Sequence, residues 1–398
     1  MAAVLAGPSA VAQEAPPPTP VPPSGSPSPY PTALATPSPS RKPPEVSASS
    51  VALADLESGQ VLYQREATAQ RPMASITKVM TALLVLEAVP PDDVVTAGPV
   101  ATQQTGALLG LQLGERRTVR DLLLALMLQS ANDAAVALAE HVAGSVPAFV
   151  DRMNERARQL GLSDTHFTSP NGLDDRGYSS ARDLAAIAVE AFRNPTFGEV
   201  VATKFATIPA PKGEPPRRVQ NRNALLWLYP GAMGVKTGFT SAAGFCLVAA
   251  AERDGLRLVS VILGAPREAF TDAATILDHG FETYERRTII DEGQEFDPLQ
   301  VGGRAVPVAA DVPVEVLVRR GAELELTVRP EPDLTLPLAE GERVGTVLVR
   351  SPSATLGESP LVVQEHVRRA PPPRDPWWER AWDAVARFFQ GLVEALFG

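Results

Sequence analysis

The chain has 398 residues, of which 44% are hydrophobic and 21% charged, so it can bury a sizeable core and is not disordered as a whole. Its formal net charge of −10 argues against a nucleic-acid partner, because such a partner needs a basic surface. A single cysteine, Cys246, excludes an intrachain disulfide and a cysteine metal cluster, and the histidines show no ligand spacing, so we expect neither a metal nor another cofactor.

The first 46 residues contain no pattern that could build a core. Residues 1–12 are small, apolar and uncharged and end in Ala-Val-Ala, as the last part of a secretory signal does before its cleavage site, although the positive opening segment is missing. A frayed alanine-rich terminus is the alternative. Residues 13–46 are rich in proline and serine, and this composition predicts an extended, disordered linker.

Residues 47–284 are predicted to form an α+β domain. Strand patterns open this segment at 49–55 and 60–64 and close it at 245–251 and 257–264. Helical patterns lie between them, over residues 76–87, 119–141, 146–160 and 181–192. A sheet assembled from both ends of a segment, with helices in between, is typical of a two-lobed α+β enzyme.

The first chemical motif is Ser75-Ile76-Thr77-Lys78, which is followed by an apolar helical run. Residues three apart on a helix share a face, so Ser75 and Lys78 are predicted to be neighbours. A serine hydroxyl is a poor nucleophile without an adjacent base, and a lysine kept neutral by burial or by a nearby cation can be that base. The S-x-x-K pattern is common by chance, and the alternative is that Ser75 is only a helix N-cap. The motif is more informative here because only 5 of the 36 basic residues are lysines, so a lysine is less often placed in it by chance.

The second motif is Ser130-Ala131-Asn132, after the apolar run 122–128. A hydroxyl and an amide two residues apart on a turn can relay a proton and hold a substrate amide. The alternative is an ordinary turn or helix end, where serine and asparagine are frequent.

The third motif is Lys236-Thr237-Gly238, in a predicted strand. Lys236 and Thr237 would offer a positive charge and a hydroxyl to a carboxylate, and Gly238 would let a ligand backbone approach closely. The alternative is a lysine at a strand edge that discourages aggregation.

Residues 285–370 change to short alternating strands separated by glycine and proline turns, for example at 312–318, 323–328 and 343–349. This pattern predicts a small all-β domain.

Residues 375–398 form a strongly two-faced helical pattern. Its apolar face is predicted to comprise Trp378, Trp382, Val385, Phe389, Leu392 and Leu396. The pattern contains no run of 18 apolar residues, so the helix is expected to lie on a membrane surface and not to span the bilayer. Packing against its own β domain is the alternative.

Taken together and in this order, S-x-x-K, S-x-N and K-T-G give a strong family resemblance. The chain resembles the serine-type D-alanyl-D-alanine carboxypeptidases, the low-molecular-mass penicillin-binding proteins. Ala131 stands where related enzymes have aspartate, but the hydroxyl and the amide remain. The likeness extends over about residues 47–398, and its further matching stretches include 129–140, 165–174, 180–183 and 236–245. It implies a β-lactamase/transpeptidase-like catalytic domain, a sheet with flanking helices plus an all-helical lobe, followed by a small all-β domain and a terminal amphipathic helix.

The resemblance implies a penicillin-sensitive reaction through an acyl-enzyme. Ser75 would attack the penultimate D-Ala carbonyl of a peptidoglycan stem peptide while Lys78 takes its proton. Ser130 would shuttle a proton, and water would hydrolyse the acyl-enzyme after the terminal D-Ala has left. The backbone N–H groups of Ser75 and Phe239 would form the oxyanion hole, and β-lactams would acylate Ser75 as covalent inhibitors.

The resemblance also implies how the substrate is held. Asn132 would bond the substrate backbone, and Lys236 and Thr237, followed by Gly238, would engage the terminal carboxylate. Arg222, in Asn-Arg-Asn, could add positive charge, with a surface or structural arginine as the alternative. The cell-wall substrate, the signal-like start and the terminal helix together predict an exported enzyme anchored peripherally to the outer face of the cytoplasmic membrane.

Three other functions are weighed against this one. A D,D-endopeptidase acting on peptidoglycan cross-bridges would use the same residues and stays open. A class A β-lactamase is disfavoured, because no glutamate between the second and third motifs begins E-x-x-L-N. A non-catalytic wall-binding protein would be expected to have lost Ser75 or Lys78, and both are present.

Overall fold

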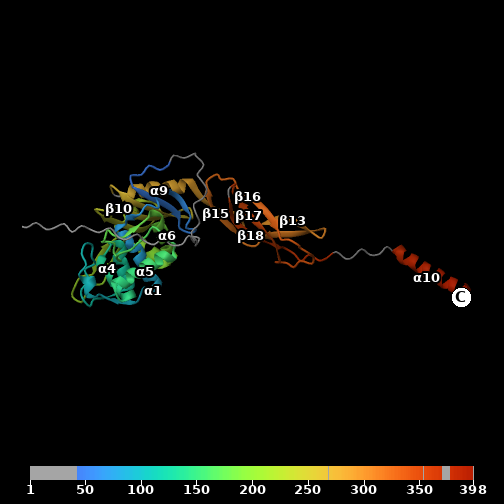
Figure 1. Cartoon of the computed structure of the whole chain (residues 1–398), viewed down its shortest axis with the longest axis horizontal. Helices are drawn as coiled ribbons and strands as arrows, with labels where there is room; N and C mark the ends of the chain where they lie inside the picture. Colours follow the sequence, from blue (N-terminus) through green and yellow to red (C-terminus); the bar gives the residue numbers. More distant parts are fainter. Residues whose placement is uncertain (1–42, 268, 353, 370–376, 398) are drawn as a thin grey trace, which may run out of the picture.

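The computed structural model describes residues 43–267, 269–352, 354–369 and 377–397. The signal-like segment 1–12 and the linker up to residue 42 lie outside these described residues, as does the start of the terminal helix at residues 375 and 376. Figure 1 shows a body of helices and sheet, a narrower all-β unit beside it, and one helix beyond that unit. The α+β fold with a smaller all-β unit predicted from the sequence is confirmed.

The body is built around an antiparallel sheet with the strand order β2-β1-β11-β10-β9. Its strands are β1 (Ser50–Asp55), β2 (Val61–Arg65), β9 (Ala232–Thr240), β10 (Gly244–Arg253) and β11 (Leu256–Ala265). Because β1 pairs with β11, the beginning and the end of the body meet in the middle of the sheet, as the sequence predicted. In this order β9, which carries the third motif, lies at an edge.

The central strands are apolar throughout because both faces of the sheet are covered. Successive side chains of a strand point to opposite faces. In β1, Val51 and Leu53 belong to the core under α9 (Phe270–Thr283), whereas Ala52 and Ala54 belong to the core on the other face. That second core is the larger one, and α6 (Ala181–Phe192) packs directly against β1 and β11.

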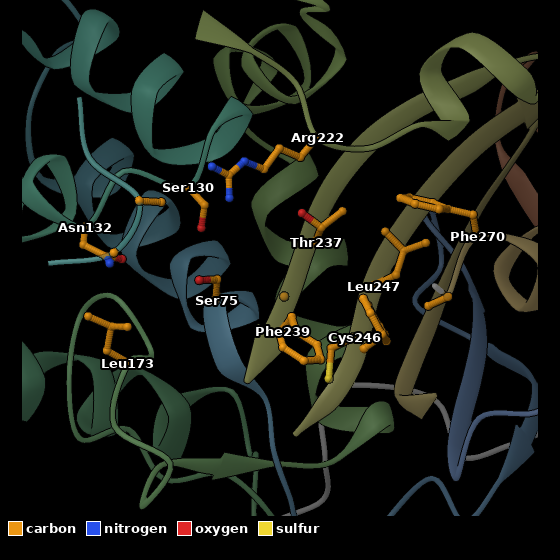
Figure 2. A pocket seen from close by; sticks show the side chains of 15 residues that line it. Ser75, Ser130, Asn132, Leu173, Arg222, Thr237, Phe239, Cys246, Leu247 and Phe270 are labelled. Carbon is orange, nitrogen blue, oxygen red and sulfur yellow. The ribbon is translucent and has the colours of Figure 1, made fainter. Parts of the chain in front are cut away.

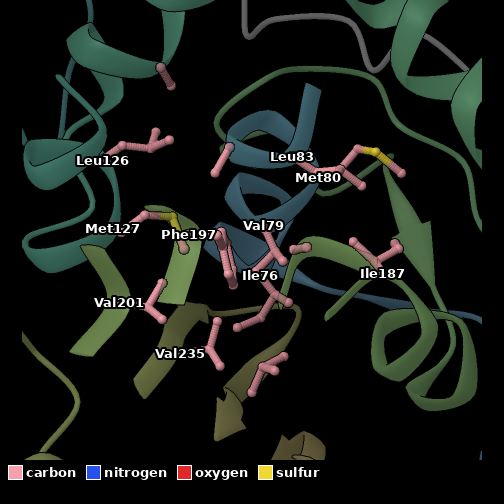
Figure 3. Close-up of a cluster of buried hydrophobic side chains, with 14 of the residues drawn as sticks. Ile76, Val79, Met80, Leu83, Leu126, Met127, Ile187, Phe197, Val201 and Val235 are labelled. Carbon is pink, nitrogen blue, oxygen red and sulfur yellow. The ribbon is translucent and has the colours of Figure 1, made fainter. Parts of the chain in front are cut away.

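Most of the remaining helices of the body gather on the face of the sheet away from α9 (Figure 1). They are η1 (Ala74–Thr77), α1 (Lys78–Ala88), α2 (Pro99–Thr102), α3 (Val119–Leu128), α4 (Asn132–Ala143), α5 (Val146–Gln159) and α7 (Pro195–Ala202). The short α8 (Leu225–Leu228) packs beside β9, and its Leu225 belongs to the core under α9. Figure 3 shows side chains from α1, α3, α6, α7 and β9 packed around Ile76 and Val79. This core lies directly beneath the first motif and fixes its position.

Side-chain caps mark where several of these helices begin. Thr118 accepts the backbone N–H of Asp121 at the start of α3, and Ser145 and Ser180 cap α5 and α6 in the same way. The single helix expected over 119–141 is wrong, because α3 ends at Leu128 and α4 begins at Asn132.

Three two-stranded ribbons complete the body. They are β3 (Arg71–Pro72) with β6 (Tyr178–Ser179), β4 (Val94–Thr96) with β5 (Arg116–Thr118), and β7 (Phe205–Ile208) with β8 (Arg217–Gln220).

The all-β unit has a core of its own. Its strands are β12 (Tyr284–Ile290), β13 (Glu295–Val301), β14 (Arg304–Ala310), β15 (Val314–Arg319), β16 (Glu325–Pro330), β17 (Arg343–Arg350) and β18 (Thr355–Val363). β13-β14-β18-β17-β16 form one sheet and β12-β15 another, and valines from both fill the space between them. The unit is tied to the body where Arg286 donates to both oxygens of buried Asp55, at 2.9 and 3.0 Å, and Tyr284 donates to the Leu62 carbonyl at 2.8 Å.

The last element is α10 (Trp377–Phe397), whose side chains from residue 378 to 395 are all exposed. Trp378, Trp382 and Phe389 are among them, so the aromatic face predicted from the sequence is open to solvent. None of the described helices combines the length and the apolar character needed to cross a membrane. The domain boundaries drawn from the sequence, at 46, 284 and 375, stay predictions.

Candidate active site

The first motif lies at the junction of two helical turns. Ser75 is in η1, and Lys78 opens α1, which continues from it without a break. Met73 is the N-cap of η1 and makes no side-chain cap bond, so the structure gives no capping role to Ser75. Ala74, just before the serine, has φ +49°, a conformation that costs a side-chain-bearing residue energy and is held here by the packing below it.

Lys78 is fully buried and reaches three oxygen atoms. Its Nζ lies 3.0 Å from Ser75 Oγ, 2.8 Å from Asn132 Oδ1 and 2.5 Å from the Asn171 carbonyl oxygen. Burial, together with the positive charges of Lys236 and Arg222, lowers the pKa of Lys78 well below its ordinary value.

The lowered pKa of Lys78 favours its neutral form. In that form its two N–H groups are taken by the amide oxygen of Asn132 and the carbonyl oxygen of Asn171, neither of which can donate. The remaining lone pair then faces the hydroxyl of Ser75. A base in this state is poised to accept the serine proton.

The second motif fills the break between α3 and α4. Ser130 adopts φ +70°, which turns the chain sharply and ends the helical pattern. Figure 2 shows the hydroxyl groups of Ser130 and Ser75 pointing into the same space. Asn132 donates to the Thr105 carbonyl at 2.6 Å while it accepts from Lys78, so its amide bridges two sides of the site.

The third motif lies on edge strand β9 beside η1. Lys236 is buried and donates to the Thr237 carbonyl at 2.8 Å. Burial and the charge of Arg222 lower the pKa of Lys236 to about 7. A Cβ at Gly238 would lie 3.2 Å from the backbone nitrogen of Ser75, so glycine lets the strand approach the nucleophile.

Arg222 is held in the site by its two neighbours. Asn221 donates to the Val201 and Thr203 carbonyls at 3.0 and 3.1 Å, and Asn223 Oδ1 accepts the backbone N–H of Leu225 at 3.1 Å. Both asparagines are buried, whereas Arg222 is exposed. Figure 2 shows its guanidinium directed toward Ser130. Of the two roles left open by the sequence, this position favours a charge within the site.

These residues surround a pocket of about 500 Å³. Its lining includes Ser75, Ser130, Asn132, Arg222, Thr237, Gly238 and Phe239, from all three motifs. The parts of the site that sequence reasoning missed include Leu173, Phe270 and the Asn171 carbonyl that holds Lys78. Leu173 and Asn171 lie in the stretch 165–174, which belongs to the family resemblance, but nothing in the sequence pointed to Phe270.

Cys246 belongs to the same wall but is buried, and burial raises the pKa of its thiol to about 11. It is therefore a packed thiol and not a nucleophile, as the sequence indicated. Among the described residues, no group of three histidine, cysteine or acidic side chains could hold a metal ion.

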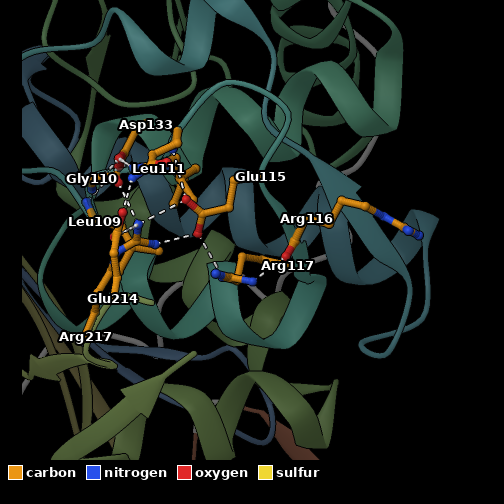
Figure 4. A network of polar contacts seen from close by, with 11 residues as sticks. Leu109, Gly110, Leu111, Glu115, Arg116, Arg117, Asp133, Glu214 and Arg217 are labelled. Carbon is orange, nitrogen blue, oxygen red and sulfur yellow. Dashed lines mark hydrogen bonds and ion pairs between the residues drawn. The ribbon is translucent and has the colours of Figure 1, made fainter. Parts of the chain in front are cut away.

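A polar network supports the loop that faces Asn132 (Figure 4). Asp133 accepts the backbone N–H groups of Leu109, Gly110 and Leu111 at 2.8–3.0 Å. Beside it, buried Glu115 accepts from Arg217 at 2.5 and 3.0 Å. The loop before residue 109 contributes Gly106 and Ala107 to the pocket, so Asp133 positions a wall of the site without lining it.

Comparisons with known proteins agree with this geometry. Residues 37–267 match the family described as D-alanyl-D-alanine carboxypeptidase, and residues 284–369 match the C-terminal domain of penicillin-binding protein 5. The D-alanyl-D-alanine carboxypeptidase DacF of Bacillus subtilis is 31% identical over 81% of this chain and 86% of its own length. DacC of Escherichia coli is 34% identical over 87% of this chain and 89% of its own. The crystal structure of penicillin-binding protein 5 from Haemophilus influenzae superposes with a TM-score of 0.66 at 32% identity, covering 83% of this chain and all (100%) of that one.

Proposed function

The chain belongs to the D-alanyl-D-alanine carboxypeptidase family, and from that membership we propose which of its residues carry the reaction. It is a serine peptidase that hydrolyses the terminal D-Ala–D-Ala bond of peptidoglycan stem peptides in cell-wall maturation. The observation that carries the assignment is the contact between buried Lys78 and Ser75.

In the proposed acylation step, the lone pair of Lys78 takes the proton of Ser75 as Oγ forms a bond to the penultimate D-Ala carbonyl carbon. The negative charge that develops on the carbonyl oxygen faces the backbone N–H groups of Ser75 and Phe239. The C–N bond then breaks, and Ser130 relays the proton held by Lys78 to the departing amine of D-Ala, so that Lys78 is again neutral and Ser130 again carries its proton. Water hydrolyses the resulting ester, which restores Ser75.

The substrate's terminal carboxylate is proposed to lie between β9 and Arg222. Thr237 and Arg222 line the pocket there and offer a hydroxyl and a cation, and buried Lys236 beside Thr237 adds a second positive charge when it is protonated. Charge-assisted bonds of this kind are the strong ones. Asn132 would use its second amide N–H for the substrate backbone, since the first is engaged by Thr105.

A β-lactam would form the same ester with Ser75, and we expect that ester to be long-lived. Within the described chain, the residues lining the pocket include no aspartate or glutamate that could activate a deacylating water. This supports a penicillin-sensitive peptidase over a β-lactamase.

We also propose that the enzyme is exported and held on the membrane surface. Residues 1–12 support export, although they lie outside the described residues. The exposed aromatic face of α10 supports peripheral anchoring, because a helix with one apolar face can lie in the headgroup region.

The direct test is release of D-Ala from a diacetyl-L-Lys-D-Ala-D-Ala peptide, with and without penicillin. We expect release that penicillin abolishes, and covalent labelling by a fluorescent penicillin that disappears in Ser75→Ala. Labelling that survives this substitution would overturn the nucleophile assignment. No D-Ala release together with rapid destruction of penicillin would favour a β-lactamase instead.

A further inference from the structure

Two loops meet beside the proposed base, and neither of them carries one of the three motifs. One is the segment 103–107, which follows α2, and the other is the segment 169–175, which lies between α5 and β6. A Cβ on Gly106 would lie 3.1 Å from Asn132 Nδ2 and 4.0 Å from Leu173 Cδ2, so the first loop lies against both the second motif and the second loop. The surroundings of the base are therefore shared between these loops.

Asn171 is buried at this junction and uses three polar groups on three different partners. Its carbonyl oxygen accepts from Lys78 Nζ at 2.5 Å, and its side-chain Oδ1 accepts the backbone N–H of Leu173 at 3.1 Å. Its Nδ2 donates to Oε1 of Gln104 at 3.0 Å. One residue thus joins the base, a residue of the pocket wall and the neighbouring loop.

Gln104 is held in place from its own side. Its Nε2 donates to the carbonyl of Val100 at 3.1 Å, and its backbone N–H donates to the carbonyl of Ala101 at 3.2 Å. Both acceptors belong to α2. These bonds fix the direction of the Gln104 side chain and present its Oε1 to Asn171.

The hydrogen bonds close into a ring around the amine of Lys78. Lys78 donates to Oδ1 of Asn132, and Nδ2 of Asn132 donates to the carbonyl of Thr105 at 2.6 Å. Thr105 is covalently joined to Gln104, which accepts from Asn171. The carbonyl of Asn171 returns to Lys78. Both carbonyl-type acceptors of the lysine are therefore held through two consecutive residues of one loop.

Resting on the proposed function, we propose that Gln104 is a positioning residue for the base Lys78. It acts through Asn171 and Thr105 and not on the substrate. A lysine ends in a compact amine on a flexible stem, so the amine needs fixed partners to hold one direction. With its two N–H groups directed to fixed acceptors, the lone pair of neutral Lys78 is directed to Ser75 Oγ.

A separate contact limits how far the base can move when this ring is broken. Thr81, one turn after Lys78 on α1, donates to the carbonyl of Pro170 at 2.6 Å. This bond does not depend on Gln104 and keeps the 169–175 loop near the base. Loss of the ring should therefore weaken the base and not abolish the reaction.

The first test is Gln104→Met, which keeps the length of the side chain and removes its acceptor. Acylation by a saturating fluorescent penicillin should slow about tenfold, a loss between that of one hydrogen bond and that of a catalytic group displaced by about 1 Å. The penicillin concentration that gives half of this rate should stay within about twofold, because the ring acts on the base and not on binding.

Gln103→Met makes the same change at the exposed neighbouring residue and is the matched control, which should alter neither quantity. An equal effect of the two variants would overturn the inference. So would a raised half-saturating concentration with an unchanged saturating rate, because Gln104 would then act on binding.

Gln104→Glu gives a readout that a merely structural role would not move. It keeps an acceptor oxygen for Asn171 and adds a negative charge near Lys78, whose charged neighbours Lys236 and Arg222 are both positive. The added charge favours the ammonium form of Lys78, so the ascending limb of the acylation rate should move to higher pH. Above that limb the rate should recover most of the loss seen in Gln104→Met. An unmoved limb would place this side chain away from the base.

A double-mutant cycle separates the bond from general damage to the loop. Asn171→Ala removes the donor of the same bond and should slow acylation at least as much as Gln104→Met does. Adding Gln104→Met to Asn171→Ala should cost less than about twofold more, because the bond is already gone. Losses that multiply would show that the two residues act separately and would overturn the ring.

Failure of this inference and failure of the proposed function give different results. If the wild type releases D-Ala and is acylated, and Gln104→Met matches it, Gln104 has no positioning role while the assignment of Lys78 stands. A wild type that neither releases D-Ala nor is labelled by penicillin would overturn both. Thermal melting shows whether each variant is folded, and the pH profile of Gln104→Glu decides the inference even if Gln104→Met does not fold.

Discussion

In the proposed reaction the base is Lys78, which is buried and contacts no carboxylate among the described residues. A charged ammonium in such a place is unstable, and two further cations nearby make it more so. In the proposed reaction, Lys236 and Arg222 would therefore have two effects at once: they would attract the carboxylate of the substrate, and their charges help to keep Lys78 neutral. Binding and activation are coupled through these charges.

This coupling predicts a bell-shaped pH profile of kcat/KM, which reports ionisations of the free enzyme. The active form has a neutral Lys78, so activity rises with pH as this group loses its proton. It also has a charged Lys236, so activity falls as pH passes the lowered pKa of about 7. A profile that is flat across neutrality would contradict both assignments.

Arg222→Gln offers a sharper form of the same prediction. Removing this positive charge makes the ammonium form of Lys78 less unfavourable, so the pKa of Lys78 should rise and the ascending limb should move to higher pH. KM for the peptide should rise as well, because one partner of the carboxylate is gone. Lys212→Ala, which removes an exposed positive charge from the turn of the β7–β8 hairpin, should move neither limb. An unchanged ascending limb in Arg222→Gln would remove Arg222 from the site.

Gly172 is predicted to be essential because it lies against the turn that bears Ser75. It has φ +71°, and a Cβ there would lie 2.0 Å from the carbonyl oxygen of Ala74. Gly172→Ala should lower kcat/KM by about a hundredfold, the scale expected when a catalytic group shifts by about 1 Å. Gly144→Ala is the control, since Gly144 has φ +78° with nothing within 4 Å, and it should lose about 1 kcal/mol of stability with near-normal activity. Equal activity in the two variants would show that the close contact is not required.

Single elements were predictable where one hydrophobic pattern covers one element. α6 was expected over 181–192 and is found there, and β10 and β11 contain the two strands expected near the end of the body. The continuous apolar pattern over 119–141 hid a break, because both α3 and α4 bury their faces in the same core and the turn between them is equally buried. Only the φ of Ser130, set by its surroundings, separates the two helices.

The same limit applies to the candidate site. The three motifs could be found because their spacing is local, and the N-R-N segment could be suspected for the same reason. Residues that enter the pocket through tertiary contacts, such as Phe270 and the carbonyl of Asn171, have no local signature. The β7–β8 hairpin likewise depends on a strand register that no short-range pattern specifies.

The loop held by Asp133 gives a prediction at the scale of elements. Asp133→Asn replaces one oxygen acceptor by an amide NH2 group that cannot accept, so at least one of the Leu109, Gly110 and Leu111 N–H groups loses its partner. Leaving such a buried group unpaired should lower the free energy of unfolding by about 2 kcal/mol. Urea denaturation measures this, with exposed Asp151→Asn on α5 as the control. Loss of stability in both variants alike would mean that charge, and not the loop contact, is responsible.

On the scale of the whole molecule, catalysis and anchoring are predicted to be separable. Deleting residues 377–398 should leave activity on a soluble peptide unchanged and release the protein from vesicles in a sedimentation assay. Trp382→Glu, on the apolar face of α10, should weaken vesicle binding, and Arg387→Glu on the polar face should have a smaller effect. A truncated chain that still sediments with vesicles would place the anchor elsewhere.

The all-β unit lies between the body and α10 in the chain, and the ion pair between Arg286 and Asp55 holds it to the body. Asp55 is completely buried, and Arg286 is the cation that contacts it, alongside two hydrogen bonds from Ser58. Arg286→Ala should therefore loosen the junction, because it leaves a buried carboxylate unpaired at a cost of about 3 kcal/mol. Limited proteolysis should then cut the chain near residue 284 faster than in the wild type, while the motifs of the active site stay intact. Equal cleavage rates would show that the ion pair does not hold the junction.

The buried position of Cys246 has a practical consequence for measuring how the body of the protein is placed relative to α10. It is the only cysteine of the chain, and as a buried thiol whose pKa is raised to about 11 it should react slowly with alkylating reagents. Cysteines introduced at two exposed positions, one on the β7–β8 hairpin and one on α10, would then accept spectroscopic labels while the native residue stays in place. The distances between the two labels would then show how far the body of the protein lies from α10, and hence from a lipid surface. The active site would keep all of its native residues during the measurement.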